Sequence, residues 1–147
     1  MSGVGFRVVK SDIAVGTSTK TLVQIVAASN HGVELDEVSI SFQGIVGTDL
    51  PILVEVLRQT TAGTMSSLTP VKAPDDTDET LQVTAQHTAT VEPTAGDILD
   101  SEYVHPQSGY TFVFEGEKIG GGDRIGIQTI NTGGVDVKAS VRVKGRE

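Results

Sequence analysis

Hydrophobic and polar residues alternate with a period of two along much of the chain, most clearly from Leu81 to Val91 and from Val135 to Val143. Such alternation is typical of strands that bury one face and expose the other. Between Val33 and Phe42 the apolar residues change phase once, at Asp36–Glu37. A β-bulge at this point keeps the same face inward on both sides of it. The pattern therefore predicts strands, one of which carries a bulge.

Six further segments are rich in the β-branched and aromatic residues that favour strands, and turn-forming residues separate them. They are Phe6–Val9, Thr21–Ala28, Ile52–Arg58, Ile98–Val104, Tyr110–Phe114 and Arg124–Ile130. About nine short strands without a convincing helix predict an all-β, single-domain β-sandwich that is jelly-roll-like. The least strand-like stretch, from Thr60 to Thr80, is expected to form a long excursion.

Two of the predicted strands, Thr21–Ala28 and Ile52–Leu57, are apolar on both faces. This pattern is typical of strands in the middle of a sheet, and it also fits strands that lie beneath a partner subunit. The length of 147 residues suits one domain. We divide the chain into residues 1–19, an N-terminal segment and candidate docking arm, and residues 20–147, the β-sandwich domain.

Composition and charge exclude several classes of function. The chain has no Cys, so disulfides, thiolate metal sites and cysteine nucleophiles are ruled out. Its formal net charge of −8 argues against a surface that binds nucleic acid, since such surfaces cluster basic residues. The first ten residues lack the apolar stretch of a signal peptide, and no apolar run is long enough to cross a membrane. We expect a soluble protein made in the cytoplasm, with no nucleic-acid or membrane partner.

Candidate catalytic and metal-binding residues are few. His31, His87 and His105 lie far apart and lack the spacing of a metal site. His87 falls on the apolar phase of its strand, where a hydrogen-bonded core or interface histidine is expected. The acidic run from Asp75 to Glu79 does not match a calcium-binding loop, so we expect a solvated loop and keep an ion site as the alternative. No nucleophile or phosphate-loop motif is present, so we predict no enzyme, metal or cofactor.

Basic side chains at the two ends of the chain are the candidate contact residues. Arg7 and Lys10 lie in the N-terminal segment, and Lys138, Arg142 and Lys144 lie on the polar face of the last predicted strand. In a strongly acidic chain these cations are candidates for contact with an acidic partner surface. Ordinary solvated strand charges remain the alternative interpretation.

Five segments, in this order along the chain, resemble a family of small structural proteins of tailed bacteriophages that includes head decoration (cement) proteins. They are Leu57–Thr64, Ser67–Val71, Ala89–Asp97, Val104–Tyr110 and Gly120–Ile127. The similarity runs from about Thr17 to the C-terminus. The resemblance implies a non-enzymatic virion component on the capsid exterior, which binds the major capsid protein and stabilises the assembled head.

The resemblance also implies an oligomeric state. Closed symmetry is usual for soluble homo-oligomers, and a homotrimer matches the local threefold positions of an icosahedral lattice. The second apolar face of Ile52–Leu57 fits burial between subunits, and it fits equally a central strand of a monomer. The alternative function is a carbohydrate- or receptor-binding jelly-roll module of a phage tail or fibre. Two Tyr, four Phe and no Trp leave little material for a sugar-stacking platform.

Overall fold

The protein is built from strands throughout the described part of the chain. The computed structural model describes residues 4–44, 50–73, 79–133 and 135–147, and these contain no helix. The strands are β1 (Gly5–Ala14), β2 (Thr19–Val26), β3 (Val33–Gln43), β4 (Ile52–Gln59), β5 (Thr64–Leu68), β6 (Val71–Lys72), β7 (Thr84–Val91), β8 (Ala95–Val104), β9 (Gly109–Ile119), β10 (Arg124–Ile130) and β11 (Lys138–Arg146). All nine expected strands are present, and β5 and β6 are additional.

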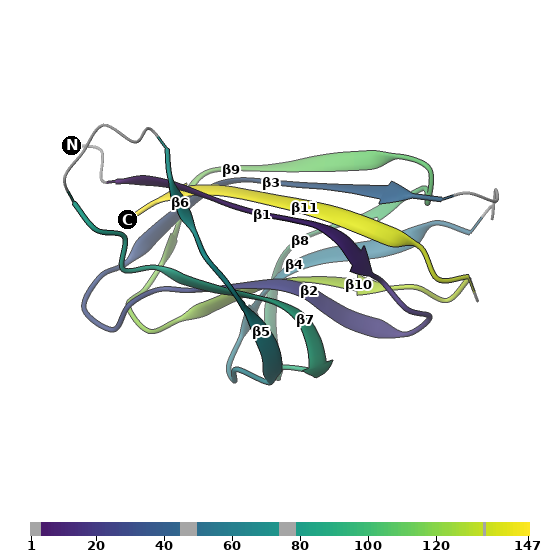
Figure 1. Ribbon diagram of the computed structural model, residues 1–147, viewed down its shortest axis with the longest axis horizontal. Helices are drawn as coiled ribbons and strands as arrows, with labels where there is room; N and C mark the ends of the chain where they lie inside the picture. Colours follow the sequence, from purple (N-terminus) through teal and green to yellow (C-terminus); the bar gives the residue numbers. More distant parts are fainter. Residues whose placement is uncertain (1–3, 45–49, 74–78, 134) are drawn as a thin grey trace.

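Two antiparallel sheets pack face to face, which confirms the β-sandwich (Figure 1). Sheet I has the strand order β6-β1-β11-β3-β9, and sheet II has the order β5-β7-β2-β10-β4-β8. When β5, β6 and β7 are set aside, the remaining strands form two four-stranded sheets, β1-β11-β3-β9 and β2-β10-β4-β8. This order, in which the last strand lies between the first and third, is that of a jelly roll.

The core lies between the sheets and is filled by the apolar phase of each strand. Phe6, Val8, Val141 and Val143 contribute from sheet I, and they pack in one cluster with residues of β2, β4 and β10 from sheet II. The strands that are apolar on both faces, β2 and β4, each lie between two neighbours within sheet II. The expectation that they occupy the middle of a sheet is therefore confirmed.

The predicted bulge in β3 is present at Asp36. Leu35 lies opposite Gly145 of β11 and Glu37 lies opposite Lys144, so Asp36 is the extra residue between them. The pairing of β3 with β9 shifts at the same place. Because of this insertion, the apolar residues on both sides of it reach the core, as the change of phase in the sequence predicts.

The stretch from Thr60 to Thr80 contains more structure than a long excursion. β5 pairs with β7, and β6 adds two residues to the edge of β1. Both strands lie at sheet edges and leave most side chains exposed, so they have no hydrophobic period for the sequence to reveal. Val71, for example, is 63% exposed. Of the acidic run, residues 75–78 lie outside the described residues.

Residues 5–14 of the candidate docking arm form β1 and belong to sheet I. β1 pairs with β11 along its length, and Phe6 is only 1% exposed within the core. The backbones of Val4 and Glu147 exchange two hydrogen bonds of 3.0 Å, so the two ends of the described chain lie side by side (Figure 1). A docking role for this segment therefore rests on its outward-facing side chains.

Candidate docking face

The outer surface of sheet I gathers six of the chain's eleven Lys and Arg residues. Ala139, Val141 and Val143 of β11 are buried, so the residues that alternate with them point away from the core. The same argument applies to β1, which pairs with β11, and to β9, which is the edge strand beyond β3. We call the resulting surface the cationic face; it comprises Arg7, Lys118, Lys138, Arg142, Lys144 and Arg146.

The structure brings four of the five predicted contact residues together. Arg7 of β1 lies directly opposite Lys144 of β11, and Arg142 and Lys138 follow on the same face of β11. Lys10 does not join them. It lies opposite the buried Val141, so it is on the core-facing phase of β1.

Carboxylates of β3 partly neutralise the cationic face. Glu37 Oε1 lies 3.3 Å from Arg142 Nη2 and 3.9 Å from Lys144 Nζ, and Asp36 Oδ2 lies 3.3 Å from Arg146 Nε. Ion pairs between side chains this exposed contribute about 0–1 kcal/mol each, so carboxylates of a partner can replace them at little cost. Within the described parts of the chain, the remaining cations of the face form no ion pair.

Two adjoining hollows of about 360 and 240 Å³ lie in the cationic face. Ser41 and Ser140 line both hollows, and they face one another across β3 and β11. Their short side chains lower the surface between Arg142, which lines the first hollow, and Lys138, which lines the second. Asp12 also lines the second hollow, so the two hollows together present hydroxyl groups, two cations and one carboxylate.

The three histidines do not form a common site. His31 lines a cavity of about 500 Å³ at one end of the sandwich, and His105 Nδ1 accepts a hydrogen bond of 3.1 Å from the backbone N–H of Gln107 in a turn. The described residues contain no group of three His, Asp or Glu side chains placed to hold a metal ion. Nor do they include a helix of the length and apolar character needed to cross a membrane.

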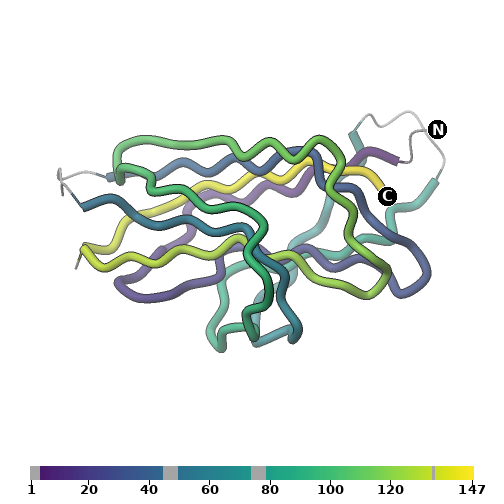
Figure 2. Tube along the Cα trace, turned by 180° about the vertical axis from the view of Figure 1, so that it is seen from behind, coloured from purple at the N-terminus to yellow at the C-terminus, as the bar shows by residue number. Residues whose placement is uncertain are grey.

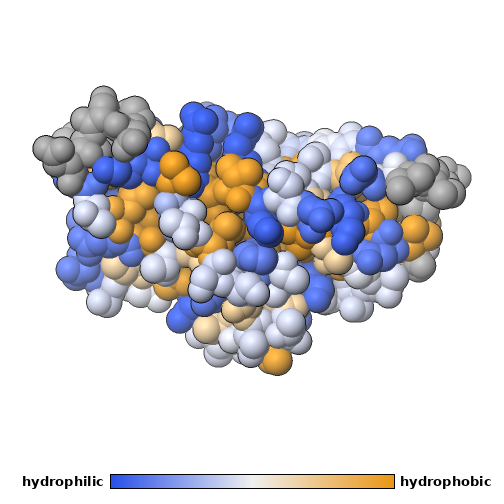
Figure 3. All heavy atoms as spheres, viewed as in Figure 1, coloured by the Kyte–Doolittle hydropathy of each residue, from blue (hydrophilic) through white to orange (hydrophobic). Residues whose placement is uncertain are grey.

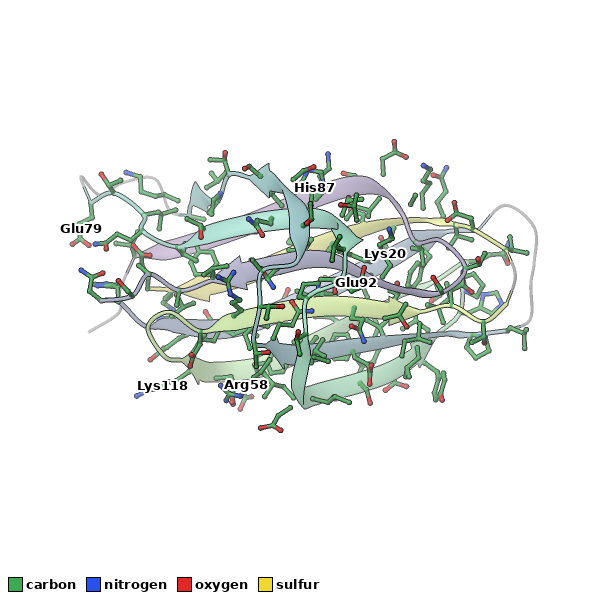
Figure 4. All side chains as sticks on the ribbon, turned by 90° about the horizontal axis from the view of Figure 1, so that it is seen from below. Lys20, Arg58, Glu79, His87, Glu92 and Lys118 are labelled. Carbon is green, nitrogen blue, oxygen red and sulfur yellow. The ribbon has the colours of Figure 1, made fainter. Side chains whose placement is uncertain are left out.

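His87 is half-buried on β7, and its Nδ1 lies 2.9 Å from the Thr88 hydroxyl. Burial lowers the pKa of His87, and the positive charge of Lys10 lowers it further. The core-facing phase of Lys10 explains this interaction, because β1 and β7 pass one another at the same side of the sandwich. Figure 4 shows His87 on the side of the molecule away from Arg58 and Lys118.

We expect the protein to lose stability as the pH falls below about 6.5 because of His87. A lowered pKa in the folded state means that the unfolded state binds the proton first, so protonation favours unfolding. His87→Gln should flatten this part of the curve when melting temperatures are measured from about pH 5 to about pH 7.5. Identical pH dependence in the variant and the wild-type protein would contradict the assignment.

A buried polar layer on the outer surface of sheet II was not predicted from the sequence. Gln24 and Gln59 are fully or almost fully buried, and Gln24 Nε2 donates to Gln59 Oε1 at 2.8 Å. Gln59 Nε2 donates in turn to the Thr21 hydroxyl at 3.0 Å. Gln24 is the one amide in a strand that otherwise reads as apolar on both faces. This amide is the feature of the sequence that could have indicated the polar layer.

The connections that follow β4 and β7 cover this polar layer. Gln24 Nε2 also donates to the carbonyl of Thr61, and the backbone N–H of Thr21 donates to Glu92 Oε1 at 2.7 Å. Lys20 Nζ donates to the carbonyl of Ala89 at 2.8 Å, and Figure 4 shows Lys20 and Glu92 near one another. The second face of β4 is therefore largely covered within one chain.

A further hollow of about 850 Å³ lies beneath β5 and β6 and is lined by apolar side chains that include Leu68, Leu81 and Val83. Figure 3 shows apolar surface across the middle of this side of the molecule, between the β1 edge of sheet I and the strands of sheet II. The lining of the hollow beneath β5 and β6 carries few charged groups, in contrast to the cationic face.

No protein-family model, curated protein or solved structure matches this chain. The class of protein is therefore defined by the fold and the surface alone: a jelly-roll β-sandwich with one cationic face. The similarity to phage structural proteins described above stays a prediction.

Proposed function

We propose that this protein is a non-enzymatic bacteriophage decoration (cement) protein, which binds the outside of an assembled head through the cationic face. The observation that carries the proposal is the gathering of Arg7, Lys138, Arg142 and Lys144 on one side of an acidic chain. Charge complementarity of this kind orients a protein on an acidic partner and speeds encounter. The partner in this proposal is the major capsid protein, and the protein resides on the capsid exterior.

The rest of the molecule supports a binding role on a shell. Six of eleven cations lie on one face, so the remaining surface is strongly acidic and repels nucleic acid. A ligand that binds only the assembled lattice lowers the free energy of that state by mass action. Many copies that bridge neighbouring capsid subunits therefore stabilise the head by binding, without any chemical step.

Reversing two charges of the cationic face is expected to weaken capsid binding by about 100-fold, because like charges then meet across the contact. The variant is Arg7→Glu with Lys144→Glu, which changes a directly opposed pair. Lys10→Glu is the control, since it reverses one charge on the same strand as Arg7 but on the core-facing phase. Binding is measured by co-sedimentation with undecorated capsids whose genes neighbour the gene for this chain. Equal loss in the control and the variant would remove the cationic face from the proposal.

Saturating amounts of the protein are expected to raise the temperature at which these capsids release their genome. The protein binds the assembled shell, so binding lowers the free energy of that state. Genome release is followed with a DNA-binding dye during heating, with and without the protein. Equal release temperatures would reject the cement role. Binding without stabilisation would favour the carbohydrate- or receptor-binding module instead.

We propose a homotrimer as the assembly that occupies threefold positions of the lattice. The second face of Ile52–Leu57 does not support it, since Glu55 and Leu57 are 8% and 1% exposed within a single chain. Sedimentation equilibrium and the shape of capsid-bound density test the trimer. A monomer mass in solution together with isolated single copies on the capsid would contradict it.

A further inference from the structure

Within the described part of the chain, β8 is an edge strand with no strand paired to its outer side. It forms the end of sheet II, where β4 is its one described partner, and all of its residues except Leu99 and Val104 are exposed. In the view from behind, β8 and β9 lie on the near side of the molecule (Figure 2). The pairing with β4 shifts register twice before Asp100, and residues 100–104 form the regular part of the edge. This part offers a row of unpaired backbone groups, which is a template for another strand.

One backbone donor of β8 is bonded to a side chain of its own strand. The N–H of Ser101 donates to Asp100 Oδ1 at 2.8 Å. A backbone N–H that is bonded locally in this way is satisfied in the free protein and remains placed to pair with an added strand. The open side of β8 therefore has a defined point at which a strand can begin to pair.

The charges of β8 determine which kind of strand can pair with it. β8 carries Asp97, Asp100 and Glu102 and no Lys or Arg. Asp100 lies opposite Val56 and Glu102 lies opposite Val54, both of them core residues, so these two carboxylates are on the core-facing side of the strand. Pairing of two copies of β8 brings these carboxylates together and is disfavoured, whereas cations on an added strand neutralise them.

The other side of β8 is apolar. Ile98 lies opposite Leu57 and Tyr103 lies opposite Leu53, on the outer surface of sheet II, and both are more than half exposed. They are two of the nine large hydrophobic side chains that are exposed in the described chain. The two sides of β8 thus differ in chemistry, with carboxylates on one and apolar side chains on the other.

We propose that β8 binds an extended segment of another protein in which cationic and apolar residues alternate. The segment adds an antiparallel strand to sheet II, with Lys or Arg beside Asp100 and Glu102 and apolar residues beside Ile98 and Tyr103. Backbone hydrogen bonds give this contact its affinity, and the two-sided pattern of β8 gives its specificity. The inference does not depend on the capsid role, because β8 does not belong to the cationic face.

A ten-residue peptide of alternating Lys and Val tests the proposal. It should bind the full-length protein, and amide resonances of β8 should shift in an NMR titration. Two peptides serve as controls: one of the same composition with Lys and Val grouped in blocks, and one of alternating Glu and Val. We expect measurable binding only for the alternating cationic peptide, and weaker binding at higher salt.

Variants of the protein separate the two parts of the contact. Ser101→Pro removes the N–H that donates to Asp100 and should abolish binding while sparing the pairing with β4. Asp100→Asn with Glu102→Gln should weaken binding about tenfold, because two exposed ion pairs are lost. Asp12→Asn on β1 is the control, since it removes one carboxylate outside sheet II and asparagine tolerates the positive φ of that position.

Three outcomes would overturn the proposal. Equal binding of the blocked and alternating peptides would indicate general attraction to an acidic protein. Undiminished binding to the Ser101→Pro variant would exclude strand addition at this edge. A smaller assembly of the Ser101→Pro variant in sedimentation would assign β8 to a second copy of this chain. None of these results bears on the charge-reversal experiment at the cationic face.

Discussion

Phe6→Ala is expected to lower the free energy of unfolding by about 3–5 kcal/mol. Phe6 is 1% exposed, and its ring lies so close to Gly145 that a Cβ atom at Gly145 would be 2.8 Å from its Cζ. Truncation therefore leaves a cavity in the core between the two sheets, at the end of β1 that pairs with Gly145. For a chain of this size the melting temperature should fall by roughly 10 °C or more.

Val9→Ala is the matched control for Phe6→Ala. Val9 lies on the same strand but on the outer phase, and it is 52% exposed. We expect a change of about 0.5 kcal/mol or less, since surface substitutions rarely cost more. Urea denaturation of both variants gives the comparison. Similar small losses would show that β1 contributes little to the core, and would favour residues 1–19 as a separable docking arm.

Gln24→Ala is expected to cost about 2–4 kcal/mol, although the substitution removes only a neutral amide. It deprives Gln59 Oε1 and the Thr61 carbonyl of their donor, and it deprives Arg124 Nη1 of an acceptor. Buried polar groups that lose their partners keep the full penalty of leaving water. The connection after β4 should also loosen, which increases hydrogen exchange at residues 60–63.

Gln43→Ala tests whether this cost comes from the polar layer. Gln43 is an exposed glutamine at the end of β3, and its loss should change stability by less than about 0.5 kcal/mol. Thermal unfolding of both variants, with hydrogen exchange for Gln24→Ala, completes the measurement. If Gln24→Ala were as mild as the control, water would be replacing the amide, and the layer would not fix the position of the connection after β4.

The sequence predicted those strands that bury one face, because burial imposes a period of two on their residues. β3 shows this most clearly: the core requires Leu35 and Val38 on the same side, so the change of phase between them reveals the bulge. β5 and β6 have little apolar surface to bury, and no such requirement acts on their sequences. Strand order was also beyond reach, since it depends on pairing between distant segments.

The candidate site shows the same division between local and distant information. Lys138, Arg142 and Lys144 share a face because they alternate along one strand, and this is visible in the sequence. That Arg7 joins them depends on the pairing of β1 with β11, which no local pattern encodes. Lys10 was grouped with Arg7 because the two are near in the chain. An interval of three residues, however, places them on opposite faces of a strand.

The position of β11 constrains when the molecule can fold during synthesis. β11 is the central strand of sheet I, and it holds β1 on one side and β3 on the other. Sheet I therefore cannot form until residues 138–146 have left the ribosome, although β1 emerges more than a hundred residues before them. Pairing between segments so far apart in the chain is slow, and the waiting strands expose apolar surface that promotes aggregation. The yield of soluble protein should consequently depend on the interval between the synthesis of β1 and that of β11.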